Sequence, residues 1–448
     1  MGSTASVSAI WRKTLAGPLA IIFSLGAATP AHSNDTAMFR GNLQHTGVYE
    51  AAGVPKLNGV KWKFHTAGKI YSSPVVAAGK VFFGSTDGNL YAIALEDGTL
   101  AWKFATKGRI TSSPAVADGV VYIESYDGNL YAVDESSGNV KWNFATAGEK
   151  RFAAKGIHGI NPPEETMPDP FDFFLSSPAI WSGAVYFGSG DGDVYAVDAA
   201  TGALKWKFQT GDVVHASPAI ADGSVYIGSW DTYFYSLDAA TGKMNWRFKT
   251  GEDPKIHNQI GIQSSAAVAD GVVYFGCRDS NLYALDARTG EKKWAYNNKG
   301  SWVIGSPAVK GGKVYFAISD GGVFRVVDAN SGAAIFSLEL KWPMFSSPAL
   351  AGNLVYIGSH EGKLYAIDPA TQKPAWVFQT DASKQNGPPL TDAAGMPNYA
   401  AAMPSNFYDD IVAGLQRMFT VGAILSSPVI VGDTLYVGSA DGNLYAIH

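Results

Sequence analysis

The sequence has little cysteine, little charge and no basic run. Its 448 residues include one cysteine, Cys277, so neither an intrachain disulfide, a thiolate zinc site nor a Cys-x-x-Cys-His haem attachment can form. Charged residues make up 16% of the chain, and the formal net charge is −5. Such a surface repels a phosphate backbone, so we expect no nucleic-acid partner.

Long apolar runs are also missing, apart from one near the N-terminus. Arg12 and Lys13 precede the apolar stretch 15–28, which contains Pro18, and small residues surround a cleavage point near Ser33. This order is typical of a secretory signal peptide, and the stretch is too short to cross a bilayer comfortably. We expect residues 1–33 to be a signal peptide, with no membrane span and a periplasmic or secreted protein. The alternative is a disordered N-terminal tail.

Glycine and an internal repeat are abundant. The 50 glycines and 12% aromatic residues suit many short strands joined by tight turns. Residues 109–144, RITSSPAVADGVVYIESYDGNLYAVDESSGNVKWNF, represent a pattern that recurs along the chain. A Ser-Pro step marks its first strand, with Ala266 once in place of the proline: Pro74, Pro114, Pro178, Pro218, Pro307, Pro348 and Pro428. An acidic residue marks its central turn at Asp87, Asp127, Asp191, Asp231, Asp279, Asp320, Glu361 and Asp441.

Each copy contains four strand-like runs separated by turn signals such as Asp118-Gly119. Asp-Gly pairs supply the left-handed backbone angles that tight hairpins need. Four antiparallel strands per roughly 40 residues predict an all-β, eight-bladed β-propeller with four-stranded antiparallel blades. The last copy ends at His448 without a fourth strand, whereas Val60–Phe64 matches a fourth strand with no predecessor. We therefore expect the N-terminal strand to complete the last blade, after a lead-in at 34–57, in a propeller spanning 58–448.

An aromatic residue recurs in each fourth strand: Trp62, Trp102, Trp142, Trp206, Trp246, Trp294, Phe336 and Trp376. Stacking platforms for a ligand would be one explanation. One ring per blade at a fixed register instead favours packing between adjacent blades.

Three copies carry insertions, at about 149–174, 252–260 and 381–421. Each falls between a fourth strand and the next first strand, so all three are expected at the same mouth of the central channel. The last includes a predicted helix at 407–419. Long loops that are not of low complexity usually carry function, although they can also shield blade edges or mediate oligomer contacts.

Residues at this mouth break the repeat. Cationic or titratable side chains occupy Lys69, Arg109, His215, Arg278 and His360. Aromatic rings occupy Tyr126, Trp230 and Trp302, and Glu124 replaces the usual glycine. Such a funnel suits a planar polyanion, because carboxylates need Arg or Lys partners and flat rings need an aromatic face.

Residues 191–206, DGDVYAVDAATGALKW, resemble the repeat of the pyrroloquinoline-quinone (PQQ) enzymes, and the resemblance covers roughly residues 58–448. Two kinds of protein share this repeat. One is the quinoprotein dehydrogenases, including polyvinyl-alcohol and other alcohol dehydrogenases. The other is the non-catalytic scaffold lipoprotein of the outer-membrane β-barrel assembly machinery. The fold therefore does not decide the function.

The resemblance to the dehydrogenases implies PQQ and Ca²⁺ as cofactors, an alcohol, sugar or polymeric hydroxyl as substrate, and a separate electron acceptor such as a cytochrome c. The residues that would bind PQQ are Lys69, Arg109, Tyr126, Trp230, Arg278, Trp302 and His360. Glu124 would be a metal ligand, and Asp172 or Asp409 would accept the alcohol proton.

Two departures leave the alternatives open. The adjacent Cys-Cys pair of many alcohol-oxidising quinoproteins is missing, and so is the N-terminal cysteine that a scaffold lipoprotein needs. We favour the dehydrogenase and keep a non-catalytic scaffold or binding module as the alternative. A third interpretation is another type of propeller enzyme that uses His158 or His257 of the insertions.

Overall fold

A computed structural model describes residues 38–251 and 261–448 of the chain. Within these residues the structure has eight four-stranded antiparallel sheets and one two-stranded sheet. The predicted all-β, eight-bladed propeller is therefore confirmed. The signal-peptide prediction at 1–33, the insertion at 252–260 and His257 lie outside the described residues.

The strands form four concentric sets. The first, innermost strands are β2 Val75–Ala77, β6 Ala115–Ala117, β12 Ala179–Trp181, β16 Ala219–Ala221, β20 Ala267–Ala269, β24 Ala308–Lys310, β28 Ala349–Ala351 and β32 Val429–Val431. The second are β3 Lys80–Gly84, β7 Val120–Ser125, β13 Ala184–Gly188, β17 Ser224–Gly228, β21 Val272–Gly276, β25 Lys313–Ala317, β29 Leu354–Gly358 and β33 Thr434–Gly438.

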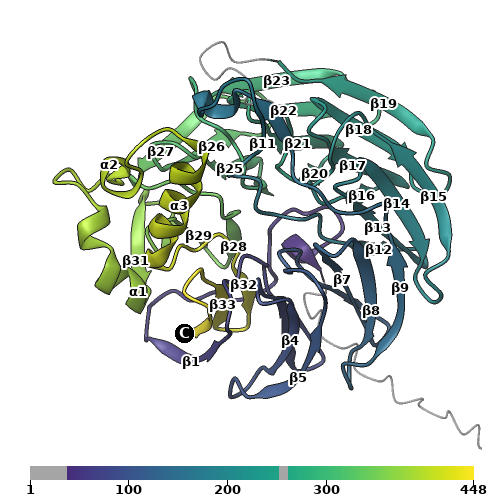
Figure 1. Ribbon diagram of the computed structural model, residues 1–448, viewed down its shortest axis with the longest axis horizontal. Coiled ribbons are helices and arrows are strands. Elements are labelled where there is room, and N and C mark those ends of the chain that lie inside the picture. Colours follow the sequence, from purple (N-terminus) through teal and green to yellow (C-terminus); the bar gives the residue numbers. More distant parts are fainter. Residues whose placement is uncertain (1–37, 252–260) are drawn as a thin grey trace, which may run out of the picture. The chain divides into compact units, whose positions relative to one another are not determined.

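The third and fourth sets complete the blades. The third strands are β4 Asn89–Ala94, β8 Asn129–Asp134, β14 Asp193–Asp198, β18 Tyr233–Asp238, β22 Asn281–Asp286, β26 Val323–Asp328, β30 Lys363–Asp368 and β34 Asn443–Ile447. The fourth are β5 Leu100–Ala105, β9 Val140–Ala145, β15 Leu204–Gln209, β19 Met244–Lys249, β23 Lys292–Asn297, β27 Ala334–Glu339, β31 Lys373–Gln379 and β1 Val60–His65. Figure 1 shows the blades following one another in chain order.

The last blade is closed by the N-terminal strand, as predicted. Its order is β1-β34-β33-β32, and Trp62 of β1 is paired with Ala446 of β34. The inner strands β2 and β32 contact each other, so the first and last blades are neighbours. Strand β1 covers the edge of β34, which would otherwise be open to pairing with another chain.

The fourth-strand tryptophans pack between blades, which confirms the packing interpretation. The Trp102 indole nitrogen donates to the Glu135 carbonyl of the next blade at 2.9 Å, and Trp206 donates to Ala239 at 2.9 Å. Gly242 faces the Trp206 ring so closely that an added Cβ would lie 2.6 Å from it. Glycine is therefore required at this turn both by its φ of +71° and by the ring.

A ring of serines links the inner strands around the channel. The Ser73 amide donates to the Ser113 hydroxyl at 3.0 Å, and Ser113 donates to Ser177 at 2.9 Å. The same bond recurs from Ser177, Ser217, Ser265, Ser306 and Ser427, each donating to the next blade's serine. The serines of the first strands therefore fasten neighbouring blades together at seven junctions among the described residues.

The lead-in segment crosses the mouth of the channel opposite to the insertions. Its carbonyls accept from inner-strand amides, as Leu43 does from Ile220 at 2.7 Å and Gln44 from Val268 at 2.8 Å. Arg40, in the short helix η1 Phe39–Gly41, is buried and donates to the Pro307 and Pro348 carbonyls at 3.0 and 2.6 Å. This segment therefore ties several blades together at their inner ends.

The two described insertions supply the remaining elements. The first holds β10 Ala153–Lys155, β11 Thr166–Pro168 and η2 Ile157–Gly159. The second holds α1 Asp381–Asn386, η3 Pro388–Leu390, α2 Tyr399–Ala402, α3 Tyr408–Met418 and η4 Phe419–Val421. Helix α3 is the helix predicted at 407–419. Among the described residues, no helix is long and apolar enough to cross a membrane.

Candidate functional site

The two described insertions meet over one mouth of the channel. Asn161 of the first insertion donates its backbone N–H to the Asn406 carbonyl at 2.9 Å and accepts from the Tyr408 N–H at 3.1 Å. The Asn161 side chain also bonds to that of Asn406 at 2.9 Å. Tyr408 and Ile411 of α3 pack on the apolar residues of the first insertion. The insertions therefore act as one unit.

Aromatic side chains from the first insertion occupy the centre of this mouth. Phe173 packs against Tyr71, Phe345 and Phe419, with ring centroids 5.9, 6.1 and 5.2 Å apart. Phe171 packs against Trp302 at 5.5 Å. Below these rings, the space beside the serine ring is a cavity of only about 40 Å³. The axis of the propeller is therefore filled by side chains at the mouth.

Arg278 lies in a closed sandwich beside these rings. Its guanidinium stands over the Trp230 ring at 4.3 Å and the Trp302 ring at 4.4 Å. It donates to the Asp169 carboxylate and, at 2.8 Å, to the Gln263 side-chain oxygen. Phe152 stacks on Trp230, with centroids 4.5 Å apart. We predicted Trp230, Arg278 and Trp302 as one PQQ-binding group; the structure brings them together, but they bind one another.

Asp169 is the counter-ion that makes this sandwich possible. Burial opposes its ionisation, but the charges of Arg278 and His158 outweigh burial and hold the pKa of Asp169 well below its usual range. The His158 ring nitrogen lies 3.0 Å from the carboxylate. The pair of Asp169 and Arg278 is fully buried, so each charge depends on the other.

A second buried charge cluster surrounds His215. Its Nδ1 lies 2.7 Å from the Asp172 carboxylate, and its Nε2 lies 3.5 Å from that of Glu149. Burial alone would lower the pKa of His215, but the two carboxylates raise it to about 10. The His215 side chain is therefore a buried imidazolium that joins the first insertion to the fourth blade.

Glu124 is buried beside this cluster. Burial, with further contributions from Glu149 and Asp191, raises the pKa of Glu124 well above its usual range. The same burial disfavours the charged carboxylate form that a hard cation such as Ca²⁺ binds. The described residues contain no cluster of three His, Cys, Asp or Glu side chains arranged to hold a metal. The predicted metal role of Glu124 therefore gains no support from its surroundings.

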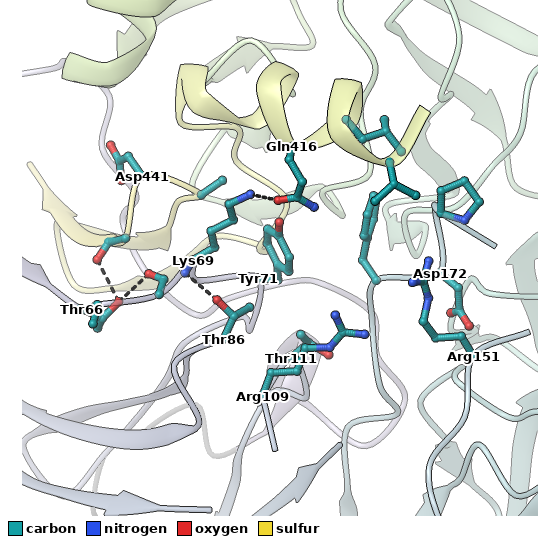
Figure 2. Close-up of a pocket in the computed structure, with 18 of the residues that line it drawn as sticks. Thr66, Lys69, Tyr71, Thr86, Arg109, Thr111, Arg151, Asp172, Gln416 and Asp441 are labelled. Carbon is teal, nitrogen blue, oxygen red and sulfur yellow. Dashed lines mark hydrogen bonds between the residues drawn. The ribbon is translucent and has the colours of Figure 1, made fainter. Parts of the chain in front are cut away.

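An open pocket of about 540 Å³ lies next to these closed clusters. Lys69 and Arg109 enter it from the first and second blades, and Arg151 enters from the first insertion (Figure 2). Tyr71 and Phe173 supply apolar surface, and Gln416 of α3 lies on the opposite side from Arg109. The Arg109 guanidinium stands 4.0 Å from the centre of the Tyr126 ring. We call this space the cationic pocket.

The cations of this pocket have no carboxylate partners among the residues that the structure describes. Lys69 donates to the Gln416 side-chain oxygen, and Arg151 donates to the Asp169 backbone carbonyl. The acids of the pocket are engaged elsewhere. Asp172 binds His215 and the Phe152 N–H at 2.7 and 2.9 Å, and Asp441 accepts from the Tyr445 hydroxyl at 2.6 Å. The pocket therefore carries an excess of positive charge.

The remaining predicted residues lie apart from this pocket. His360 lines a different cavity, where burial lowers its pKa to about 3. Asp409 is exposed in the first turn of α3 and lines neither cavity. Of the predicted residues, Lys69, Arg109 and Asp172 thus share one pocket, with Tyr126 beneath Arg109. Sequence reasoning missed Arg151 and Asp169, which lie in an insertion that no other blade repeats.

Comparison with known proteins agrees with the fold. The family model described as outer membrane protein assembly factor BamB matches residues 8–155, 172–378 and 297–402. No curated protein matches the chain.

Solved structures of more than one kind are similar to the chain. BamB from Moraxella catarrhalis is 17% identical with a TM-score of 0.62, covering 87% of this chain and 97% of that one. The quinohemoprotein alcohol dehydrogenase from Comamonas testosteroni is 16% identical with a TM-score of 0.68, covering 94% and 81%. A europium-containing methanol dehydrogenase is 14% identical with a TM-score of 0.65, covering 92% and 98%. At these identities the likeness concerns the fold.

Proposed function

Because the chain belongs to the family described as outer membrane protein assembly factor BamB, we propose that it is an exported binding propeller. Its cationic pocket takes a small ligand with two or three carboxylate or similar anionic groups. The observation that carries this proposal is the convergence of Lys69, Arg109 and Arg151 without a carboxylate partner among the described residues. Export rests on the predicted signal peptide.

Electrostatics favours an anionic occupant. Burial lowers the pKa of Lys69, which shows that its charge is partly removed from water. An anion would restore the lost solvation, and each charge-assisted hydrogen bond contributes about 1.5–3 kcal/mol. Two or three such bonds contribute about 3–9 kcal/mol before the entropy cost of association is subtracted.

The shape of the pocket suits a compact ring-bearing molecule. A cavity of about 540 Å³ falls within the usual range for small-molecule sites. Tyr71 and Phe173 give the ligand an apolar wall, and Gln416 offers a neutral hydrogen-bonding group opposite Arg109. A flat tricarboxylate could therefore meet the three cations while its ring contacts the aromatic wall.

The second candidate is the quinoprotein dehydrogenase, and one observation favours it. Lys69, Arg109 and Asp172, which we predicted for that activity, line the same pocket. PQQ would supply a quinone that accepts hydride from an alcohol or sugar hydroxyl, and a separate acceptor such as a cytochrome c would then take the electrons. The anionic edge of PQQ fits the three cations.

The catalytic half of that site does not fit the residues present. Both Asp172 oxygens already accept a hydrogen bond, from His215 and from the Phe152 N–H, so transfer of an alcohol proton to Asp172 would compete with these partners. Burial raises the pKa of Glu124 and so disfavours the carboxylate form that a base or a cation ligand needs. The faces of Trp230 are covered by Arg278 and Phe152. We therefore favour binding over dehydrogenation.

Calorimetric titration of the mature chain tests the proposal. The probes are trimesate, a flat tricarboxylate, and PQQ with and without Ca²⁺. We expect one trimesate to bind per chain. Arg109→Gln should lower the affinity for trimesate about 10-fold or more, because one charge-assisted hydrogen bond is lost. Lys107→Gln is the matched control, since Lys107 is exposed two residues away and does not line the pocket.

The outcomes separate the two candidates. Binding of trimesate that depends on Arg109 but not on Lys107 supports the binding propeller. Ca²⁺-dependent binding of PQQ with dye-linked oxidation of an alcohol would replace it with the dehydrogenase. If neither probe binds, or if both variants weaken binding equally, the cationic pocket is not a ligand site.

A further inference from the structure

A second cavity, of about 260 Å³, lies between the two insertions and the sixth and seventh blades. Its wall is aromatic and apolar, and includes Trp302, Trp342, Phe345, Phe419, Met403 and Ile411. No lysine or arginine is among its lining residues. We call it the aromatic cavity. It differs from the cationic pocket in its charge and in its size.

Several buried nitrogens in this wall have no partner in the described part of the chain. The Trp302 Nε1, Trp342 Nε1 and His360 Nε2 atoms are buried, and none has a hydrogen-bond partner among residues 38–251 and 261–448. An indole N–H can only donate, so it needs an acceptor. Leaving such a donor unpaired costs about 1–3 kcal/mol. Two donors in one cavity wall therefore indicate that an acceptor belongs in the cavity.

The titratable groups of the cavity disfavour a charged occupant. His360 is neutral at physiological pH, because burial lowers its pKa to about 3. Burial also raises the pKa of Asp320, against the opposing effects of the Ser319 hydroxyl and His158. His158 is held by the buried Asp169 at 3.0 Å. The environment thus penalises free charge, whereas the indole N–H groups of Trp302 and Trp342 have no acceptor among the described residues.

We propose that the aromatic cavity binds a neutral, two-ring aromatic molecule that carries a carbonyl or comparable oxygen acceptor. A cavity of about 150 Å³ holds one benzene ring, so the larger volume here accommodates two fused rings. The ring system contacts the aromatic wall, and the oxygen accepts from Trp342 or Trp302. This proposal does not rest on the anionic ligand of the cationic pocket.

The two sites are neighbours but are divided by packed rings. Phe173 lines the cationic pocket, and its centroid lies 5.2 Å from that of Phe419, which lines the aromatic cavity. Leu415 of α3 contributes to both. A neutral probe and an anionic probe should therefore occupy separate places, and each site can be tested without filling the other.

Equilibrium dialysis of the mature chain with a matched probe pair tests the proposal. Acetylnaphthalene carries a carbonyl acceptor, and ethylnaphthalene, substituted at the same ring carbon, has a similar shape without it. We expect both to bind and the acetyl compound to bind about 3- to 10-fold more tightly, as one buried hydrogen bond provides. Arg109→Gln should leave both affinities unchanged.

Three variants assign the binding to this cavity. Trp342→Phe and Trp302→Phe keep an aromatic ring and remove the N–H, so the acetyl preference should fall in at least one of them and vanish in the double variant. Ile411→Trp should fill the cavity and lower the binding affinity of both probes at least 10-fold. Trp294→Phe is the control, because its N–H donates to Ala329 between blades at 3.0 Å.

Several results would overturn the proposal. They are absence of saturable binding of both probes, equal affinity for the two, and a preference that survives the double variant. Binding that Ile411→Trp leaves intact would place the probes elsewhere. If a crystal structure with acetylnaphthalene shows only water beside the Trp342 and Trp302 nitrogens, the donors are satisfied by solvent and the cavity has no such ligand.

Discussion

The ring of blades and the loop-bearing mouth use polar groups in different ways. In the ring, each recurring donor meets a recurring acceptor: the turn acid accepts from a third-strand tyrosine, as Asp87 does from Tyr91 at 2.8 Å and Asp231 from Tyr235 at 2.6 Å. At the mouth, Arg278, His215 and Glu124 have surroundings that no other blade repeats. Lys69, Arg109 and Arg151 have no carboxylate partner among the described residues.

This difference distinguishes polar groups that stabilise the fold from polar groups that are available for function. A partner that recurs in blade after blade satisfies a structural need, because every blade must pack in the same way. A charged side chain that lacks an ionic partner in one blade only serves no such packing need. The free-energy cost of its partial burial must be offset by a ligand or by solvent. Substitutions in the two regions should therefore cost unequal amounts of stability.

Removing the counter-ion of Arg278 should cause the largest loss. Asp169→Asn leaves a buried guanidinium uncompensated, and we expect the free energy of unfolding in urea to fall by about 3–5 kcal/mol. Asp381→Asn is the control, since its ion pairs with Lys63 and Lys384 are exposed. Equal effects of the two changes would mean that the sandwich contributes no more than a surface pair.

The buried imidazolium of His215 should make stability depend on pH. Its pKa is raised from 6.5 to about 10 in the folded state. A raised pKa stabilises the fold fully below about pH 6.5, and this stabilisation is lost as the pH rises through about 10. The stability difference between wild type and His215→Gln should therefore shrink over that interval. His65→Gln, which removes an exposed imidazole, is the control, and a constant difference for His215 would contradict the assignment.

Two glycine changes test the packing of the ring. Gly223 and Gly242 have φ of +72° and +71°, but an added Cβ meets nothing within 4 Å at Gly223 and lies 2.6 Å from Trp206 at Gly242. We expect Gly223→Ala to cost about 1–2 kcal/mol from backbone strain. Gly242→Ala should cost about 1–3 kcal/mol more, because it displaces the ring. Equal losses in thermal or urea unfolding would show that the tryptophan is not packed tightly there.

Neutralising a cation of the open pocket should change stability least. Lys69 is partly buried, its pKa is lowered by burial, and no described carboxylate pairs with it. Lys69→Gln should therefore alter the free energy of unfolding by less than about 0.5 kcal/mol. The same change should lower the affinity of the chain for trimesate. A loss comparable to that of Asp169→Asn would make Lys69 a structural residue.

The repeat made the ring predictable from the sequence. The Ser-Pro steps and turn acids located every blade, and the lone fourth strand at Val60 predicted how the ring closes. The inter-blade role of residues such as Trp102 followed from its fixed register, because equivalent positions in a repeat must pack alike. The bonds of the serine ring were not predicted, since sequence does not show which hydroxyl faces the neighbouring blade.

The mouth was predictable only in part. Lys69 and Arg109 were identified because they break a repeated position, and they do line one pocket with Asp172. Arg278 was identified in the same way, but its partner Asp169 lies 109 residues away in an insertion. No spacing rule connects such residues, so the sequence could not show that the guanidinium is already neutralised. Arg151 lies in an insertion, so no equivalent position in another blade could mark it as unusual.

A crystal structure of residues 34–448 grown with trimesate would decide whether the cationic pocket is a ligand site. The account predicts density for the tricarboxylate in the cationic pocket, with carboxylates on Arg109, Arg151 and Lys69 and the Arg278–Asp169 sandwich unchanged. An empty pocket at saturating trimesate, or a ligand that instead opens the sandwich and stacks on Trp230, would contradict it.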